Sequence, residues 1–162
     1  MKMSAENLIA SMEKLYKLHK GLYDIAVKKT DIIKKGDMDA LNQVLKDEQK
    51  YVAAIATIEK ERQQAACVLV PNQENPTVSD CYDLLNEIEQ FQLAEIANSL
   101  SELVFELKEQ NFLNQQLIHQ SLQFVNMSLN LFNPQPEAIN YGPPSGNQKN
   151  MKNTSGLFNS RV

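Results

Sequence analysis

The chain contains one stretch, residues 91–132, that has neither glycine nor proline and repeats apolar residues at alternating steps of three and four. A sustained heptad pattern without a helix breaker predicts a long α-helix with one apolar seam. We expect this helix to be the spine of the fold, with the rest of the chain packed along it. The predicted seam consists of Leu93, Ala97, Leu100, Val104, Leu107, Asn111, Asn114, Ile118, Ser121 and Val125.

Two amphipathic stretches precede the long helix and predict a helical hairpin. Residues 4–35 carry apolar side chains at steps of three, four and seven, which mark one face of a helix. This helix should end at Gly36, which tolerates a left-handed conformation. Asp37 should then cap a second helix that runs to about residue 66. So short a turn implies that the two helices are antiparallel.

Two prolines interrupt the helical pattern between residues 70 and 76, and Thr77 with Asp80 then forms the pattern of a capping box. The box predicts a short helix, which either ends or continues into the long one. The fold class is therefore predicted to be all-α. We expect an antiparallel helical hairpin plus a long C-terminal helix, forming an elongated three- to four-helix bundle over residues 1–132. Residues 133–162 are rich in Pro, Gly, Asn and Ser, which predicts a flexible, disordered tail.

Charge and hydropathy exclude several classes of partner. The formal net charge of −4 offers no basic surface for phosphate, so no nucleic-acid partner is expected. No run reaches the roughly 18 apolar residues of a membrane span, and the N-terminus lacks an apolar signal segment. We therefore expect no membrane insertion and a cytoplasmic location. Cys67 and Cys81 are too few and too widely spaced for a zinc site, and we expect thiols without a special role.

Catalytic and cofactor motifs are not found in the sequence. Neither His19 nor His119 follows a glutamate by three residues, as the ligands of a di-iron helical bundle would. Five glycines form no phosphate-binding loop, and no Ser or Cys lies in a nucleophile motif. The chain is predicted to be no enzyme and to hold no cofactor or metal. Glu59 and Arg62, three residues apart, are expected to form a structural ion pair.

The C-terminal half of the long helix differs from the rest of the chain in charge. No Asp, Glu, Lys or Arg occurs between Glu109 and Glu137, while apolar residues point in several directions and amides occupy the seam at Asn111 and Asn114. One interpretation is a central helix buried by its own bundle. A second is a groove for an amphipathic partner helix, and a third is the seam of a self-associating coiled coil. Full burial would leave many amides in need of hydrogen-bond partners, which favours a protein partner.

Three segments resemble flagellar export chaperones of the FlgN type. The second predicted helix is similar to that of the family, from Gly36-Asp37-Met38-Asp39-Ala40-Leu41 to Ile58-Glu59-Lys60-Glu61-Arg62, with Ile58 in place of the usual Leu. The segment Asn111-Phe112-Leu113-Asn114-Gln115-Gln116-Leu117, followed by Ser121-Leu122, resembles the Asn-x-x-Asn-x-x-Leu motif of the family. Asn140-Tyr141-Gly142 is similar to a motif of the family's tail. Together the matches span about residues 8–142.

The resemblance implies a cytosolic chaperone that binds the C-terminal helical segments of the hook-filament junction proteins FlgK and FlgL and delivers them to the export gate. In the family, the tyrosine of the tail motif is associated with docking on the cytoplasmic domain of the gate protein FlhA, a role that would fall to Tyr141 and Gly142. Alternatives are a structural coiled-coil protein, a homodimer in the absence of cargo, and a chaperone for another late substrate. The predicted cargo-binding residues are Asn111, Asn114, Leu117, Ile118, Ser121, Leu122, Phe124, Val125 and Leu129.

Overall fold

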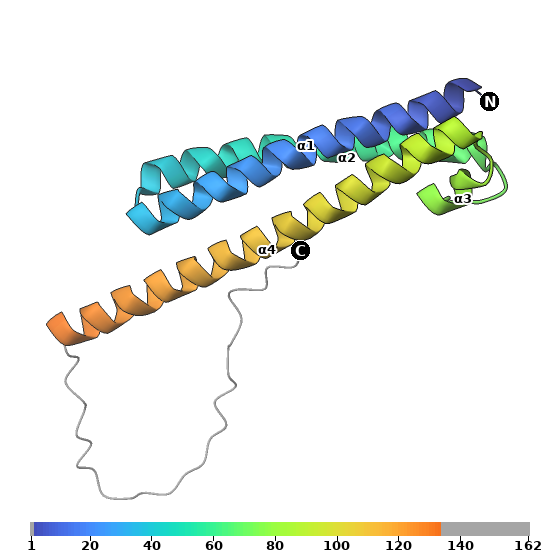
Figure 1. The fold of residues 1–162 in the computed structure, drawn as a ribbon. Coiled ribbons are helices and arrows are strands. Elements are labelled where there is room, and N and C mark those ends of the chain that lie inside the picture. The colour runs from blue at the N-terminus through green and yellow to red at the C-terminus, as the bar shows by residue number, and fades with distance from the viewer. Residues whose placement is uncertain (1, 134–162) are drawn as a thin grey trace, which may run out of the picture.

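The computed structural model describes residues 2–133, and every regular element in this part of the chain is an α-helix. The helices are α1 (Lys2–Lys35), α2 (Met38–Leu69), α3 (Val78–Tyr82) and α4 (Glu87–Phe132). α1 and α2 form an antiparallel hairpin, and α4 lies along α1 and runs in the same direction (Figure 1). The predicted all-α fold, a hairpin with a long C-terminal helix, is confirmed. The predicted tail lies outside the described residues, except for Asn133.

The turn between α1 and α2 has the chemistry that ends one helix and begins the next. Gly36 has a φ of +68°, a left-handed conformation that glycine adopts at little cost. The Asp37 side chain accepts a hydrogen bond from the Ala40 amide at 3.0 Å and so caps α2. Lys34 and Lys35 lie in the last turn of α1, where they meet the negative end of the helix dipole.

α2 contains the predicted ion pair but extends further than the pattern indicates. Arg62 Nε lies 3.0 Å from both carboxylate oxygens of Glu59, and these hydrogen bonds raise the pKa of the guanidinium. The helix ends at Leu69 rather than near residue 66. Pro71 restricts the backbone of the residue before it, Val70, so the helix can continue up to that point.

Two capping boxes show that α3 and α4 are separate helices. Thr77 and Asp80 form the box that opens α3, as predicted. Asn86 and Glu89 form a second one, in which each side chain accepts a hydrogen bond from the backbone amide of the other. α4 therefore begins at Glu87, before the predicted start near residue 91.

The hydrophobic core lies at one end of the bundle, where the N-terminal half of α1, the end of α2, α3 and the start of α4 converge (Figure 1). Leu8, Ala66 and Cys81 have no measurable exposure there. Burying an apolar side chain the size of leucine stabilises a fold by about 1.5–3 kcal/mol. This end therefore anchors the start of α4. The core consists of Ala5, Leu8, Ile9, Met12, Leu15, Ala65, Ala66, Leu69, Cys81, Leu85 and Leu93.

Candidate functional site

A buried polar cluster holds α4 against α1 in a parallel register. The Thr30 hydroxyl donates a hydrogen bond to Asn114 Oδ1 at 2.5 Å, and Asn114 Nδ2 donates to the Ala26 carbonyl at 2.8 Å. Gln110 Nε2 donates to the Thr30 hydroxyl. Within the described residues, no buried side-chain nitrogen or oxygen lacks a hydrogen-bond partner. Thr30 and Asn114 are 84 positions apart in sequence, which gives the offset between the two helices.

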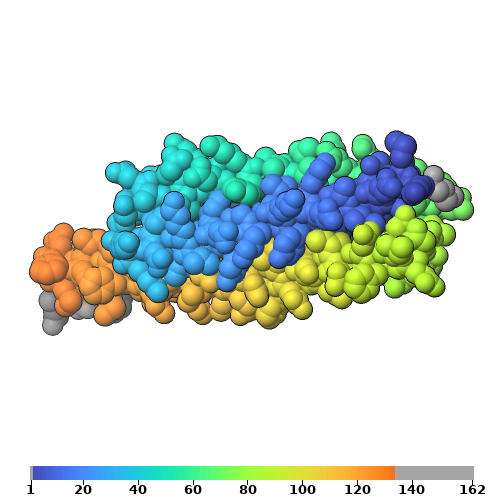
Figure 2. Space-filling view, turned by 45° about the horizontal axis from the view of Figure 1, so that its top comes forward, coloured from blue at the N-terminus to red at the C-terminus, as the bar shows by residue number. Residues whose placement is uncertain are grey.

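α4 is longer than the hairpin against which it packs. α1 ends at Lys35, which this offset places level with about residue 119 of α4. α4 continues to Phe132, so about 13 residues, or about 20 Å of helix, extend beyond the hairpin. Figure 2 shows this projecting end of α4 in orange. We call residues 120–132 the overhang.

The face of α4 that packs on α1 continues into the overhang, where no described element covers it. Ser121, Val125, Ser128 and Phe132 follow Asn114 at helical steps of seven, four, three and four, and so lie on the same face. Further apolar side chains widen this face on both flanks. The exposed apolar residues of the overhang are Leu122, Phe124, Val125, Met127, Leu129, Leu131 and Phe132. An uncovered apolar surface of this kind is typical of a protein-binding site.

An apolar recess of about 330 Å³ lies where α4 leaves the hairpin. Four of the predicted cargo-binding residues line its α4 side, namely Ile118, Ser121, Leu122 and Val125. The opposite side comes from the end of the hairpin: Ile32, Ile33, Gly36, Asp37, Met38 and Leu41. The structure therefore brings these predicted residues together and adds a second wall that the sequence pattern did not indicate.

The structure places Asn114 inside the contact between α1 and α4. Its side chain is 2% exposed, and both ends of its amide are bonded to α1. While α1 and α4 are packed, this residue has no free polar atom to offer a cargo. Asn111 is half-buried, and its side chain forms no hydrogen bond with another described residue. Leu117 is half-buried, whereas Phe124 and Leu129 lie in the overhang and are 71% and 60% exposed.

Thr30, the residue that pairs with Asn114, was not predicted as a partner from the sequence. Thr30 lies on the core-facing side of α1, and a polar residue in such a position needs a hydrogen-bond partner. Thr30 was therefore the feature of the sequence that could have predicted a buried polar contact. The predicted seam also differs at one position, because Leu103 is buried against α1 while Val104 is 42% exposed. The predicted docking residues Tyr141 and Gly142 lie outside the described residues.

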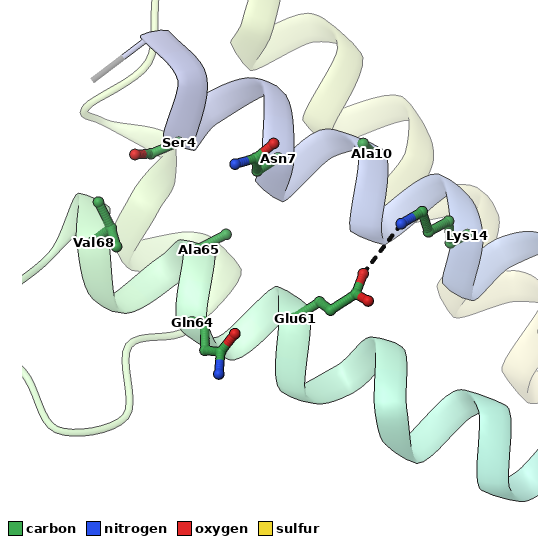
Figure 3. A pocket seen from close by; sticks show the side chains of 8 residues that line it. All are labelled: Ser4, Asn7, Ala10, Lys14, Glu61, Gln64, Ala65 and Val68. Atoms are coloured by element: carbon green, nitrogen blue, oxygen red, sulfur yellow. Dashed lines mark hydrogen bonds and ion pairs between the residues drawn. The ribbon is translucent and has the colours of Figure 1, made fainter.

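A second recess lies near the other end of the hairpin, between α1 and α2 (Figure 3). It contains an ion pair, with Lys14 Nζ 3.1 Å from Glu61 Oε2, whose side chains are both about half exposed. Among residues 2–133, no three or more His, Cys, Asp or Glu side chains are grouped so that they could hold a metal ion. Burial raises the pKa of the Cys81 thiol, which disfavours the reactive thiolate.

None of the helices in the described part of the chain combines the length and hydropathy needed to cross a membrane.

The fold and the site define a helical binding protein whose most prominent surface is the uncovered end of one helix. Residues 1–149 match the FlgN protein family, and the chain belongs to this family of flagellar export chaperones. Uncharacterized protein YvyG of Bacillus subtilis (strain 168) is 32% identical over 139 residues, which cover 86% of this chain and 87% of that relative. No solved structure matches the chain.

Proposed function

We propose that the chain is a cytosolic export chaperone that binds the C-terminal helical segments of FlgK and FlgL on the recess and the overhang. Binding there keeps the cargo from assembling prematurely until it reaches the export gate. The observation that carries this proposal is the continuation of the α1-facing seam of α4 beyond the end of α1. A cargo helix would occupy along the overhang the place that α1 occupies along the preceding part of α4.

The charge pattern supports a helix as the occupant. Neither the overhang nor the wall of the recess formed by α4 carries an ionisable side chain, and the nearby His119 is exposed. An amphipathic cargo helix could therefore bury its apolar face against the overhang without removing a carboxylate or an ammonium group from water. The recess beside Gly36 would receive an apolar anchor from the cargo, and anchors of this type supply most of the affinity in many interfaces.

An export chaperone must also release its cargo. Burial of apolar area contributes about 25 cal/mol per Å². Ordering a previously disordered segment opposes binding by about 2–5 kcal/mol. The difference between the two gives a complex that is firm but reversible, since nothing in the site forms a covalent bond.

Delivery would use a different part of the chain. We propose that Tyr141 and Gly142 dock on the cytoplasmic domain of FlhA. Tyr141→Ala should then leave cargo affinity unchanged and weaken binding of the chaperone–cargo complex to that domain. Titration of the purified complex with the FlhA domain measures this. Equal loss of cargo binding would contradict the division between the two sites.

Calorimetric titration of the full chain with the C-terminal segments of FlgK and FlgL tests cargo binding, with a flagellin segment as comparison. We expect binding of the first two segments with a negative heat-capacity change, the mark of apolar burial. The variant Phe124→Gln should weaken this binding about tenfold, a change of about 1.4 kcal/mol. Phe105→Gln is the matched control, since Phe105 is 63% exposed on the same helix but lies outside the overhang. The absence of heat with all three segments would overturn the proposal.

The same surface could instead join two copies of the chain, which is the main competing function. Sedimentation over a range of concentrations separates the two proposals. A monomer at all concentrations supports the chaperone site, whereas a dimer that dissociates in Phe124→Gln assigns the overhang to self-association.

A further inference from the structure

The side of α4 that points away from α1 carries a second regular pattern, which the proposed function does not use. The pattern consists of Phe91, Glu95, Asn98, Glu102, Phe105, Glu109 and Phe112, at alternating steps of four and three. Such steps place side chains in one line along a helix. All members of this line, which we call the outer stripe, are exposed. The line lies opposite Leu93, Leu103 and Leu107, which are buried.

Aromatic side chains give the outer stripe its apolar character. Phe91, Phe105 and Phe112 are 64%, 63% and 57% exposed. α4 packs principally against α1, so no described helix covers this side of it (Figure 1). Exposed phenylalanines in a regular row differ from the scattered apolar residues of an ordinary surface, and aromatic residues are frequent anchors in interfaces.

Negative charge accompanies the aromatic residues. α4 contains six glutamates and a single lysine, Lys108. Glu95, Glu102 and Glu109 recur every seven residues within the outer stripe, and Glu106 lies beside them. The ion pairs among the described residues involve carboxylates of α1 and α2 only. The charges of the outer stripe are therefore available to a partner, and they repel nucleic acid and anionic lipid.

We propose that the outer stripe binds an amphipathic helix of a partner protein, one whose apolar face is flanked by Lys and Arg. The phenylalanines would pack against the apolar face of the partner, while the glutamates would pair with its basic flanks and orient its approach. The overhang carries no acidic residue and lies beyond the hairpin, so the two surfaces can be occupied together. This proposal goes beyond cargo binding and does not depend on it.

Three synthetic peptides serve as probes for the full chain in fluorescence anisotropy. The first is a helix with Leu at the a and d positions and Lys or Arg on the flanks. The second keeps the same Leu pattern but has Glu on the flanks, and the third has the composition of the first in scrambled order. We expect the first peptide to bind at least about tenfold more tightly than the others, and less tightly as salt is raised. Equal affinity of the first and third peptides, or no binding of the first, would overturn the proposal.

Two variants locate the binding on the outer stripe. The triple variant Glu95→Gln, Glu102→Gln, Glu109→Gln should lower the affinity for the first peptide about tenfold or more. The control Asp31→Asn, Glu74→Gln, Asp83→Asn changes the net charge equally at exposed positions elsewhere, and should change affinity less than about twofold. Equal effects of the two triple variants would show that the peptide responds to the net charge of the chain, which would overturn the proposal that it binds the outer stripe.

A reciprocal pair of substitutions separates this surface from the cargo site. Phe105→Gln should weaken binding of the basic peptide and leave binding of the FlgK and FlgL segments unchanged. Phe124→Gln should weaken binding of those segments and leave binding of the basic peptide unchanged. Loss of peptide binding in Phe124→Gln but not in Phe105→Gln would place the peptide on the overhang and overturn the proposal, without affecting the test of cargo binding. Circular dichroism of each variant confirms that the helices remain folded.

Discussion

Thr30 and Asn114 share a hydrogen bond across the interface of α1 and α4, in a seam whose neighbouring buried positions are apolar. A buried amide and a buried hydroxyl must both be paired, and sliding α4 along α1 by one turn would separate them. The pair therefore favours one register of the two helices. Because α1 ends at Lys35, this register also determines how much of α4 projects beyond the hairpin.

Replacing Asn114 should measurably destabilise the fold. Asn114→Ala leaves the Thr30 hydroxyl and the Ala26 carbonyl without the amide that binds them, which we expect to cost about 1–3 kcal/mol. Urea unfolding measures the difference. Asn111→Ala is the matched control and should change the free energy of unfolding by less than about 0.5 kcal/mol. Equal effects of the two substitutions would show that the polar cluster adds no stability.

The cost of replacing Gly36 should come from the backbone conformation of the turn and not from a steric clash of the new side chain. Apart from Gly36 and its two neighbours in the chain, no heavy atom of the described residues lies within 4 Å of where a Cβ would be, but the φ of +68° disfavours residues with a side chain. Gly36→Ala should therefore lower stability by about 1–2 kcal/mol. Gly36→Asn should lose less, because asparagine adopts the left-handed region more readily. Thermal unfolding compares the two, and identical losses would point to a cause other than φ.

The capping box at Asn86 should stabilise the start of α4. Asn86→Ala removes the side-chain oxygen that accepts a hydrogen bond from the Glu89 amide at 2.9 Å, with an expected cost of about 1 kcal/mol. Asn98→Ala makes the same change at an exposed position inside α4, where alanine is the better helix former. It should be neutral or slightly stabilising in the same chemical denaturation. A loss as large as that of Asn86→Ala would contradict the role of the cap.

The contribution of the α3 cap to stability should decrease at acid pH. Hydrogen bonds from the hydroxyl and the amide of Thr77 lower the pKa of the exposed Asp80 carboxyl below its ordinary value of 3.8. Its stabilising contribution is therefore present above that ordinary value and is lost as pH falls through the lower pKa of the folded state. Asp80→Asn should be less stable than the parent chain near neutral pH, and the gap should close in acid. Thermal unfolding across this range tests it, and a gap independent of pH would refute the assignment.

Local features of the fold were predictable because each depends on a few neighbouring residues. Gly36 with Asp37 predicted the hairpin turn, and Thr77 with Asp80 predicted the start of α3. The register of α1 and α4 was not predictable, since the heptad pattern is compatible with several offsets between two helices. For this reason the polarity of Asn114 indicated a cargo contact in the sequence, whereas the structure pairs it with Thr30. The recess was missed for the same reason, because its two walls are far apart along the chain.

The unequal lengths of α1 and α4 have a consequence for backbone dynamics. Helical hydrogen bonds in the overhang lack support from a neighbouring helix, and an unsupported helix end frays. Amide hydrogen exchange in the free protein should therefore be slow around Asn114, where the helices are packed, and become progressively faster toward Phe132. A cargo helix that replaces α1 along the overhang would remove this gradient. Cargo binding would then be detectable as slower amide exchange in the overhang of α4, without any change in the rest of the fold.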